Sequence, residues 1–418
     1  MKTRRIRPRN PIDSVVGVPG SKSIANRALI LGALADGETV IKNVPDGDDT
    51  QAMIDALIAL GLEINRAKSD VTILGPINLD DSSPVVLDAR LAGTTSRFLT
   101  AVGALRSGPT TIDGGASLRS RPNADLRKCL SAVGAKVVST VSDGLPVQVS
   151  RGDQLADRVS VRGDISSQFL TALLLIASSL PKGLVIDVEG DLVSRSYIEM
   201  TVEILRSFGV NVEFSGHSAI VRAGRPRART YSVEPDASSA SYPLAAAAIA
   251  GGRVKVEGLG TNSLQSDAVF RDLLRAMGCE VHADDSTVVS RDLSVPLVGI
   301  DVDLRNASDL VPTLAAVCCF ASTPSEISGI GFIRRKESNR IEGLAEQLCA
   351  LGADVRATAD GLLIQPASLH GGVVNTMHDH RIAMALALVG LNVDGVEITE
   401  PEVVSKSWPA YWEMFDAL

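Results

Sequence analysis

The chain has 418 residues, of which 45% are hydrophobic, 22% are charged and only 3% are aromatic. This composition is typical of a globular protein, and the length allows two domains with ample core. The formal net charge of −8 excludes a generally basic surface, so we expect neither nucleic acid nor membrane as a partner. An anionic ligand must therefore be bound by a local cluster of cations.

The first ten residues, MKTRRIRPRN, are basic, but no apolar segment follows them, so we expect no secretory signal. No run approaches the roughly 18 apolar residues of a membrane span. The cysteines form no C-x-x-C pair and no framework spacing, which predicts small core residues in a reducing compartment. They are Cys129, Cys279, Cys318, Cys319 and Cys349. We expect a cytoplasmic protein.

The first motif, VGVPGSKSIANRALIL at 16–31, begins as a phosphate-binding loop might. A Walker A loop reads G-x-x-x-x-G-K-[ST]. Aligned on Lys22, its two glycines would fall on Val16 and Ser21, and neither residue is glycine. The sequence therefore argues against a nucleotide site, although Lys22, Ser23 and Arg27 gather at the start of an apolar helix.

An apolar helix followed by an alternating strand occurs six times along the chain. The copies lie at 27–44, 97–114, 168–190, 242–259, 310–330 and 382–399. A second helix follows the first five copies and ends in L-x-x-x-G before a short strand. Its closing glycines suit a left-handed C′ position; they are Gly61, Gly134, Gly209, Gly278 and Gly352. The tail AYWEMFDAL at 410–418 would be the truncated sixth second helix.

The first helix of each copy is apolar all round, which indicates that it is buried rather than amphipathic. Strands would then cover the helices, as in an α/β protein with helices inside sheets. Six units of about 70 residues favour two domains of three units each, and the polar segment 223–235 is the best boundary. A single larger domain remains the alternative.

Polar residues precede each apolar helix, in GSKSIANR, LAGTTSR, GDISSQ, EPDASSASY, NASDLVP and MHDHR. For any one of them, ordinary N-capping is the better explanation. Six similar helix starts, however, would together present unpaired N–H groups and partial positive charge, and several carry a cation. A cleft between the domains lined in this way would suit a polyanionic small molecule.

Further cations lie in loops beside Ser, Gly and Pro rather than on charged helix faces. They are Arg119, Arg121, Arg195, Arg334, Arg335, Lys336, Arg340 and Lys406. Scattered surface cations are usually only solvated, so their position at segment junctions is what makes them candidates for anion binding.

These motifs resemble, in order and along the whole chain, the 5-enolpyruvylshikimate-3-phosphate synthases of the enolpyruvyl transferase family. The matching segments are PGSKSIANRALILGALADG, LAGTTSRFL, SRP, SSQFLTALL, SRSYIEMT, EPDASSASYPLAAAAIAGG, SDLVPTLAA, KESNRI and DHRIAMALAL. The resemblance implies a two-domain inside-out α/β barrel, each domain with three βαβαββ repeats, buried helices and outer sheets. We place the domains at 15–229 and at 230–418 with 1–14, and the active site in the cleft between them.

The resemblance implies transfer of the enolpyruvyl group of phosphoenolpyruvate to the 5-hydroxyl of shikimate 3-phosphate, with release of phosphate. It implies these small-molecule substrates, no metal or other cofactor, and a monomer. Residues that would hold shikimate 3-phosphate are Lys22, Ser23, Arg27, Ser166, Ser167, Gln168, Ser194, Asp309 and Lys336. Residues that would contact phosphoenolpyruvate are Lys22, Gly93, Arg121, Gln168, Arg340, Arg381 and Lys406. The family also places the inhibitor glyphosate in this pocket, beside Gly93.

The implied chemistry is addition followed by elimination through a tetrahedral ketal phosphate. The resemblance assigns proton acceptance to Asp309 and makes Glu337 and Lys22 the remaining proton-transfer partners, with their division of labour open. A carboxylate and an ammonium facing each other in a dry, closed cleft would have pKa values shifted to suit this work.

Two positions depart from the family pattern. Leu91 stands where many relatives have Asn before AGT, so a polar contact at that helix start is missing or replaced. Asn339 stands for the usual Asp in KESNR, so a charge that could orient Arg340 is lost. Neither is an assigned site residue, and we expect an active enzyme with altered substrate affinity.

Three alternatives remain. A UDP-N-acetylglucosamine enolpyruvyl transferase would carry KNAA at the first motif and a reactive loop Cys, and the loop at 114–126 has none. A non-catalytic anion-binding protein on the same fold would have lost Lys22, Asp309 or Glu337. An RNA 3′-phosphate cyclase would need ATP and an adenylated His, and the acidic net charge opposes RNA binding.

Overall fold

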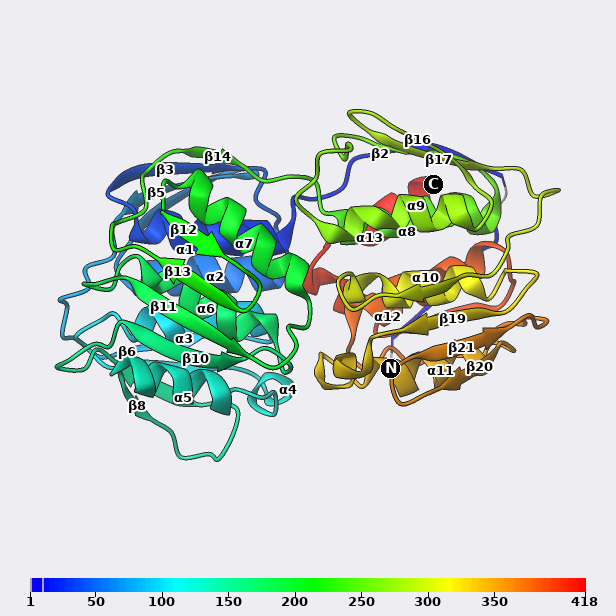
Figure 1. Ribbon diagram of the computed structural model, residues 1–418. Helices are drawn as coiled ribbons and strands as arrows, with labels where there is room; N and C mark the ends of the chain where they lie inside the picture. The colour runs from blue at the N-terminus through cyan, green and yellow to red at the C-terminus, as the bar shows by residue number, and fades with distance from the viewer. Residues whose placement is uncertain (1, 10) are drawn as a thin grey trace. The chain divides into compact units, whose positions relative to one another are not determined.

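A computed structural model describes residues 2–9 and 11–418. The chain divides into two compact units (Figure 1), which we describe separately. The N-terminal unit is Gly20–Val233, and the C-terminal unit combines the residues up to Pro19 with Glu234–Leu418.

The N-terminal unit contains three four-stranded sheets with the orders β14-β3-β5-β4, β6-β7-β9-β8 and β10-β11-β13-β12. Each has one parallel pair at an edge, and its other neighbours are antiparallel. The strands are β3 (Gly37–Lys42), β4 (Glu63–Ala67), β5 (Asp70–Gly75), β6 (Val85–Asp88), β7 (Thr110–Asp113), β8 (Lys136–Val138), β9 (Val147–Ser150), β10 (Arg158–Arg162), β11 (Leu184–Glu189), β12 (Val212–Phe214), β13 (Ser218–Val221) and β14 (Thr230–Ser232). The helices are α1 (Lys22–Leu34), α2 (Asp48–Ala59), α3 (Gly93–Gly103), α4 (Ala116–Arg119), α5 (Ala124–Val133), α6 (Ser167–Ala177) and α7 (Arg195–Ser207).

The C-terminal unit repeats this plan with the orders β16-β17-β15-β2, β18-β19-β21-β20 and β1-β23-β22. Its strands are β1 (Thr3–Arg5), β2 (Ile12–Val16), β15 (Gly252–Val256), β16 (Glu280–Ala283), β17 (Thr287–Arg291), β18 (Asp301–Asp303), β19 (Ser325–Ser328), β20 (Asp354–Ala357), β21 (Leu362–Gln365), β22 (Gly372–Val374) and β23 (Val396–Thr399). Its α-helices are α8 (Ala237–Ala250), α9 (Phe270–Ala276), α10 (Val311–Cys318), α11 (Arg340–Cys349), α12 (His380–Ala387) and α13 (Tyr411–Ala417). Its 3₁₀ helices are η1 (Ser266–Val269), η2 (Ser308–Leu310), η3 (Gly331–Arg335), η4 (Leu388–Leu391) and η5 (Pro401–Lys406).

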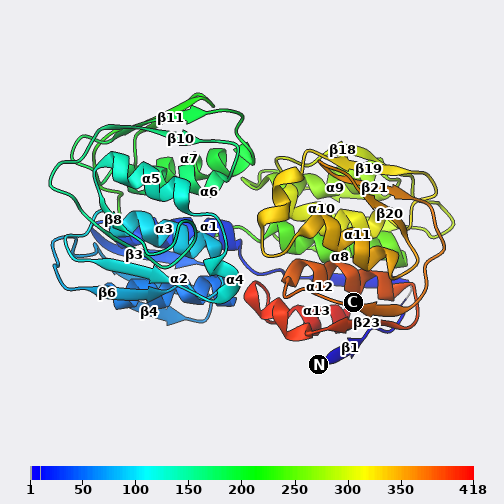
Figure 2. The same cartoon turned by 90° about the horizontal axis from the view of Figure 1, so that it is seen from below.

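The apolar helices form the core of each unit, as their composition predicts. Every residue of α8, α10 and α12 is buried, and so are nearly all residues of α1, α3 and α6. Strands such as β10 alternate between buried and exposed residues, so each presents one face to the helices and one to solvent. In both views of the N-terminal unit, α1, α3 and α6 lie among its sheets (Figure 2). The α/β prediction is confirmed.

The repeat boundaries also agree with the sequence pattern. The five glycines that close the second helices all adopt positive φ angles; they are Gly61, Gly134, Gly209, Gly278 and Gly352. The tail forms α13 as expected. β1 pairs antiparallel with β23 and supplies the outer strand of the sixth repeat.

The unit boundaries differ by a few residues from the predicted 15–229 and 230–418 with 1–14, since the units meet after Pro19 and after Val233. Val15 and Val16 belong to β2, which pairs in parallel with β15 and therefore lies in the C-terminal unit. β14 pairs in parallel with β3 and lies in the N-terminal unit. The C-terminal unit thus takes all of β2 from the start of the chain, and the N-terminal unit extends to the end of β14, because backbone pairing completes these sheets.

Four of the five cysteines are buried, as expected, but Cys349 is exposed because it lies on the outer side of the last turn of α11. In the part of the chain that the structure describes, no helix is long and apolar enough to cross a membrane.

Candidate active site

In the N-terminal unit, the starts of α1, α2 and α3 are joined by polar contacts. Lys22, the first residue of α1, places its Nζ 2.8 Å from Oδ2 of Asp49 in the first turn of α2. The Thr95 hydroxyl of α3 donates to the Asp49 carbonyl oxygen at 3.0 Å. The ammonium of Lys22 is thus held at these helix starts while 20% of its side chain stays exposed, so it remains accessible to a ligand.

Arg27 joins α1 to α6 and α7. Its Nε donates to Thr201 Oγ1 at 2.8 Å, and its other nitrogens donate to Thr171 and to two backbone carbonyls. Burial lowers the pKa of Arg27 to about 10. Among the residues that the structure describes, no carboxylate forms an ion pair with this guanidinium. A buried cation with only neutral partners favours binding of an anion beside it.

Gly93, the first residue of α3, lies against two guanidinium groups. A Cβ built on Gly93 would lie 2.6 Å from an Arg121 terminal nitrogen and 2.7 Å from one of Arg97. Arg97 donates to the Gly93 carbonyl at 3.0 Å and to the Pro122 carbonyl at 2.9 Å. The absence of a side chain at Gly93 is therefore what allows both cations to lie at this helix start.

The predicted serines lie at the starts of α6 and α7. Ser166 caps α6 and accepts a hydrogen bond from the Gln168 backbone N–H at 3.3 Å. The Gln168 Oε1 is buried and has no hydrogen-bond partner among the described residues. Ser194 caps α7 at φ 54°, ψ 43°, a left-handed conformation that is uncommon for serine. Strained, polar helix starts of this kind are frequent at functional sites.

In the C-terminal unit, Arg340 at the start of α11 is the centre of an ionic cluster. Its guanidinium donates to Asp379 at 2.8 and 3.2 Å, to Glu337 at 2.8 Å and to Asp309 at 3.3 Å. The Arg340 side chain is 1% exposed. Because Arg340 binds Asp309 and Glu337 through different nitrogens, it positions two carboxylates with one rigid group.

Arg381 of α12 extends the cluster on the other side of Asp309. Its NH2 group donates to Asp309 Oδ2 at 2.7 Å, and its backbone N–H donates to Asp379 Oδ1 at 3.0 Å. Asp379 thus caps α12 while it orients Arg340. The hydroxyl of Ser338 also donates to Asp379, at 2.9 Å. Asp309, Glu337, Arg340 and Arg381, all predicted from sequence, lie together.

The cations dominate the electrostatics of Asp309. Burial by itself would raise the pKa of Asp309, but the charges of Arg381, Lys336 and Arg340 outweigh it and hold the pKa well below its usual range. Burial would lower the pKa of Arg340, and the three carboxylates, led by Asp379, raise it instead. In this state Asp309 is therefore a fixed carboxylate. The expectation of pKa values suited to proton transfer concerned a dry, closed cleft and stays a prediction.

The remaining predicted residues also belong to the C-terminal unit. Lys336 ends η3, where its charge acts on Asp309. Lys406 lies in η5 and is 7% exposed. Tyr242 of α8, which the sequence analysis did not single out, is buried near Arg381, and burial raises its pKa to about 12.

The structure also locates the two departures from the family pattern. Leu91 lies in the turn before α3 and is 43% exposed. Asn339 stands at the N-cap position of α11 without a capping hydrogen bond from its side chain. The expected loss of an orienting charge does not loosen Arg340, because Asp379, Glu337 and Asp309 orient it. The sequence analysis missed Asp379 and Asp49 as partners. For Asp379 the signal was its N-cap position in MHDHR.

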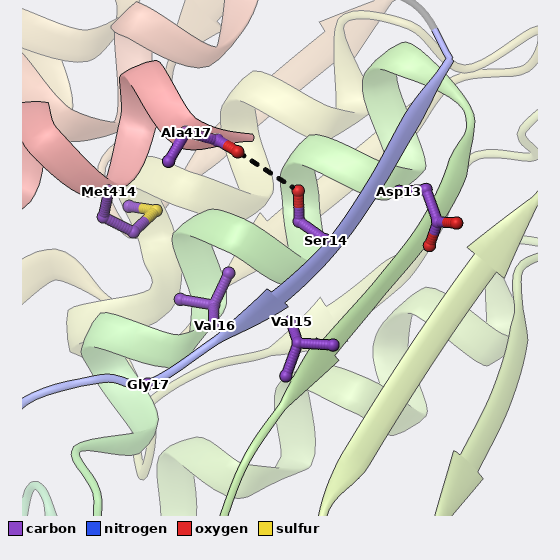
Figure 3. A pocket seen from close by; sticks show the side chains of 7 residues that line it. All are labelled: Asp13, Ser14, Val15, Val16, Gly17, Met414 and Ala417. Atoms are coloured by element: carbon purple, nitrogen blue, oxygen red, sulfur yellow. Dashed lines mark hydrogen bonds between the residues drawn. The ribbon is translucent and has the colours of Figure 1, made fainter.

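A pocket of about 420 Å³ lies elsewhere in the C-terminal unit, between β2 and α13 (Figure 3). Its lining residues are Asp13, Ser14, Val15, Val16, Gly17, Met414 and Ala417. The Ser14 hydroxyl donates to the Ala417 carbonyl at 3.4 Å. The one charged lining residue is acidic, so this pocket is unsuited to a phosphate-bearing substrate. Within residues 2–9 and 11–418, no group of three or more His, Cys, Asp or Glu side chains is arranged to hold a metal ion.

Comparison with known proteins connects this geometry to one family. The family model of EPSP synthase (3-phosphoshikimate 1-carboxyvinyltransferase) matches residues 6–415. A 3-phosphoshikimate 1-carboxyvinyltransferase from Nostoc punctiforme is 38% identical over 97% of this chain and 96% of its own length. One from Shewanella pealeana is 36% identical over the full length of both chains.

Comparison with solved structures points to the same family. An EPSP synthase from Acinetobacter baumannii superposes with a TM-score of 0.81 at 26% identity, covering 99% of this chain and 97% of that one. The enolpyruvyl transferase NikO from Streptomyces tendae shares the fold, with a TM-score of 0.76 at 18% identity over 99% of this chain and 96% of that one. The profile match and the identities over the whole length lead to one conclusion: this chain belongs to the EPSP synthase family.

Proposed function

We propose that this protein transfers the enolpyruvyl group of phosphoenolpyruvate to the 5-hydroxyl of shikimate 3-phosphate and releases phosphate. The product is 5-enolpyruvylshikimate 3-phosphate, an intermediate of aromatic amino acid biosynthesis. We further propose that the protein acts as a cytoplasmic monomer.

One observation of the site carries this assignment. A single buried guanidinium, that of Arg340, binds both Asp309 and Glu337, at 3.3 and 2.8 Å. Addition to an enol phosphate followed by elimination requires a base and an acid close to one reacting centre. The guanidinium of Arg340 fixes two carboxyl groups side by side, and in a chain of this family one can act as the base and the other as the acid.

The substrates are polyanions, and the proposed binding groups are cations, hydroxyls and backbone N–H groups at helix starts. For shikimate 3-phosphate they are Lys22, Ser23, Arg27, Ser166, Ser167, Gln168, Ser194, Asp309 and Lys336. For phosphoenolpyruvate they are Lys22, Gly93, Arg121, Gln168, Arg340, Arg381 and Lys406. Each set contains residues of both units.

Substrate binding would convert Asp309 from a fixed carboxylate into a base. Arg381, Lys336 and Arg340 hold its pKa low when no substrate is bound. Phosphate and carboxylate groups placed on these cations would cancel much of their attraction for Asp309. The pKa of Asp309 would then rise, and its carboxylate would accept the proton of the 5-hydroxyl only when both substrates are in place.

In the addition step, the 5-oxygen bonds to the central carbon of phosphoenolpyruvate while the methylene carbon gains a proton and becomes methyl. In the elimination step, the methyl group loses a proton and the carbon–oxygen bond to phosphate breaks. We assign the transfers at this carbon to Glu337 and Lys22, whose division of labour is open. The low-dielectric site would strengthen each of these interactions.

Phosphate release tests the assignment. Purified protein is incubated with phosphoenolpyruvate and either shikimate 3-phosphate or UDP-N-acetylglucosamine. We expect phosphate only with shikimate 3-phosphate. Release with UDP-N-acetylglucosamine alone would assign the chain to the related transferase activity, and release with neither would contradict enolpyruvyl transfer.

A further inference from the structure

Asp267 in η1 is a buried carboxyl group outside the proposed set of site residues. It is 3% exposed. The Ser238 hydroxyl donates to its Oδ2, while its Oδ1 is buried and has no hydrogen-bond partner among the described residues. In the part of the chain that the structure describes, no Lys or Arg forms an ion pair with it. An ionised carboxylate in this position is costly, because one neutral hydroxyl replaces its water.

Contacts of η1 bring Asp267 close to the ionic cluster around Arg340. The Ser266 hydroxyl donates to the Asn306 carbonyl at 2.6 Å and so joins η1 to the loop that precedes η2. Asp309 of the ionic cluster lies in η2. Both η1 and η2 pack against α8, whose first turn carries Ser238. The charged groups that act on Asp267 are Asp236 at the start of α8, Asp309 in η2 and Arg381 on α12.

These neighbours leave Asp267 near the point of titration at neutral pH. Burial, first, and the charge of Asp309, second, raise the pKa of Asp267, while Ser238 and Arg381 lower it, and the net result is a pKa of about 7. Arg381 is one of the cations assigned to phosphoenolpyruvate. An anion bound to Arg381 would cancel a charge that favours the ionised form of Asp267 and would also repel that form.

We propose that Asp267 is a positioning residue that takes up one proton from solvent when an anion binds to Arg381. The proton joins the carboxylate of Asp267 to give the neutral acid, and no other bond changes. Uptake removes a negative charge behind the anion site, so phosphoenolpyruvate binds more tightly when Asp267 is protonated. The proposal rests on the proposed function for the identity of the anion.

The test is proton-linked binding of phosphoenolpyruvate near pH 7, measured by calorimetry in buffers with different ionisation enthalpies. We expect wild type to take up more protons than Asp267→Asn, and its KM for phosphoenolpyruvate to rise more steeply with pH between 6 and 8, by up to tenfold per pH unit. The phosphate of the ligand titrates in the same range, so the difference between the two proteins is the quantity of interest.

Two further variants separate this role from a structural one. Ser238→Ala removes the hydrogen bond that lowers the pKa of Asp267, so the KM inflection should move to higher pH without disappearing. Asp272→Asn changes an exposed carboxylate on α9 that pairs with Arg275, and should behave like wild type. Asp267→Asn with the proton uptake and pH slope of wild type, or Ser238→Ala with an unmoved inflection, would overturn the proposal. Absence of phosphoenolpyruvate binding to wild type would instead overturn the proposed function, and this proposal with it.

Discussion

Replacing Gly93 by Ala perturbs the candidate phosphoenolpyruvate site through a single methyl group. The new Cβ would lie 2.6 Å from an Arg121 terminal nitrogen and 2.7 Å from one of Arg97. To lie at a van der Waals distance of about 3.5 Å from the new Cβ, the guanidinium groups must shift by about 0.9 Å. Gly93 is not in the left-handed region, and Ala is the better helix former, so the backbone should accept the change.

The expected loss follows from the displaced cation. A hydrogen bond to a charged group contributes about 1.5–3 kcal/mol, and a partial shift removes about half of it. We therefore expect a loss of about 1.4 kcal/mol, which is a tenfold rise in KM for phosphoenolpyruvate. Glyphosate, the bulkier ligand that the family resemblance places in the same pocket, should lose more affinity. The affinity for shikimate 3-phosphate should change little.

Steady-state kinetics and thermal denaturation of Gly93→Ala give these quantities. Gly103→Ala is the matched control, because it adds a methyl group to the other end of α3, where the neighbour is Thr110 rather than an arginine. Equal losses of affinity for both substrates, or unfolding of Gly93→Ala, would refute the reasoning, since Gly93 would then be a backbone requirement and not part of the phosphoenolpyruvate site.

Two further substitutions test the ionic cluster. Asp309→Asn should keep the fold and the affinity for shikimate 3-phosphate but lower kcat by about 10²–10⁴-fold, the usual contribution of a general base; kcat within threefold of wild type would remove Asp309 from that role. Asp379→Asn leaves the buried Arg340 without its main partner and should lower the free energy of unfolding by about 3–5 kcal/mol, measured by urea denaturation; an unchanged midpoint would show that Glu337 and Asp309 suffice. Burial would raise the pKa of Asp379, but Arg340 and His380 lower it overall, so its contribution is present at neutral pH and is lost as acid protonates it, and wild type should lose more stability than Asp379→Asn below about pH 4.

The helical core of this fold could be predicted from the sequence because it depends on local patterns. Six apolar helices and the glycines that end their partners recur along the chain, and each signal lies within one repeat. The strand pairings at the unit boundaries could not be predicted in this way. The family resemblance placed residues 1–14 with the C-terminal domain, but β2 and β14 form backbone hydrogen bonds with strands more than 180 residues away, and residues 12–16 carry no local mark of their partner.

The residues of the candidate site also fall into those that the sequence could predict and those that it could not. Motifs identified Asp309, Glu337, Arg340 and Arg381, which lie together in the structure. The groups that orient them were missed, because their roles arise only from packing. Asp379 appeared as a helix cap in the sequence, yet it also holds Arg340. Asn339 raised the expectation of a lost orienting charge, and three carboxylates provide that charge instead: Glu337 of the same motif, Asp309 and Asp379.

The most direct test of the central claim follows the bridging oxygen of phosphoenolpyruvate. Purified protein is supplied with shikimate 3-phosphate and phosphoenolpyruvate that carries ¹⁸O between carbon and phosphorus. Enolpyruvyl transfer breaks the carbon–oxygen bond, so we predict that phosphate forms only when shikimate 3-phosphate is present and that ³¹P NMR finds the ¹⁸O in this phosphate. Phosphate without ¹⁸O, with the label left on pyruvate, would show cleavage of the phosphorus–oxygen bond and would contradict the account.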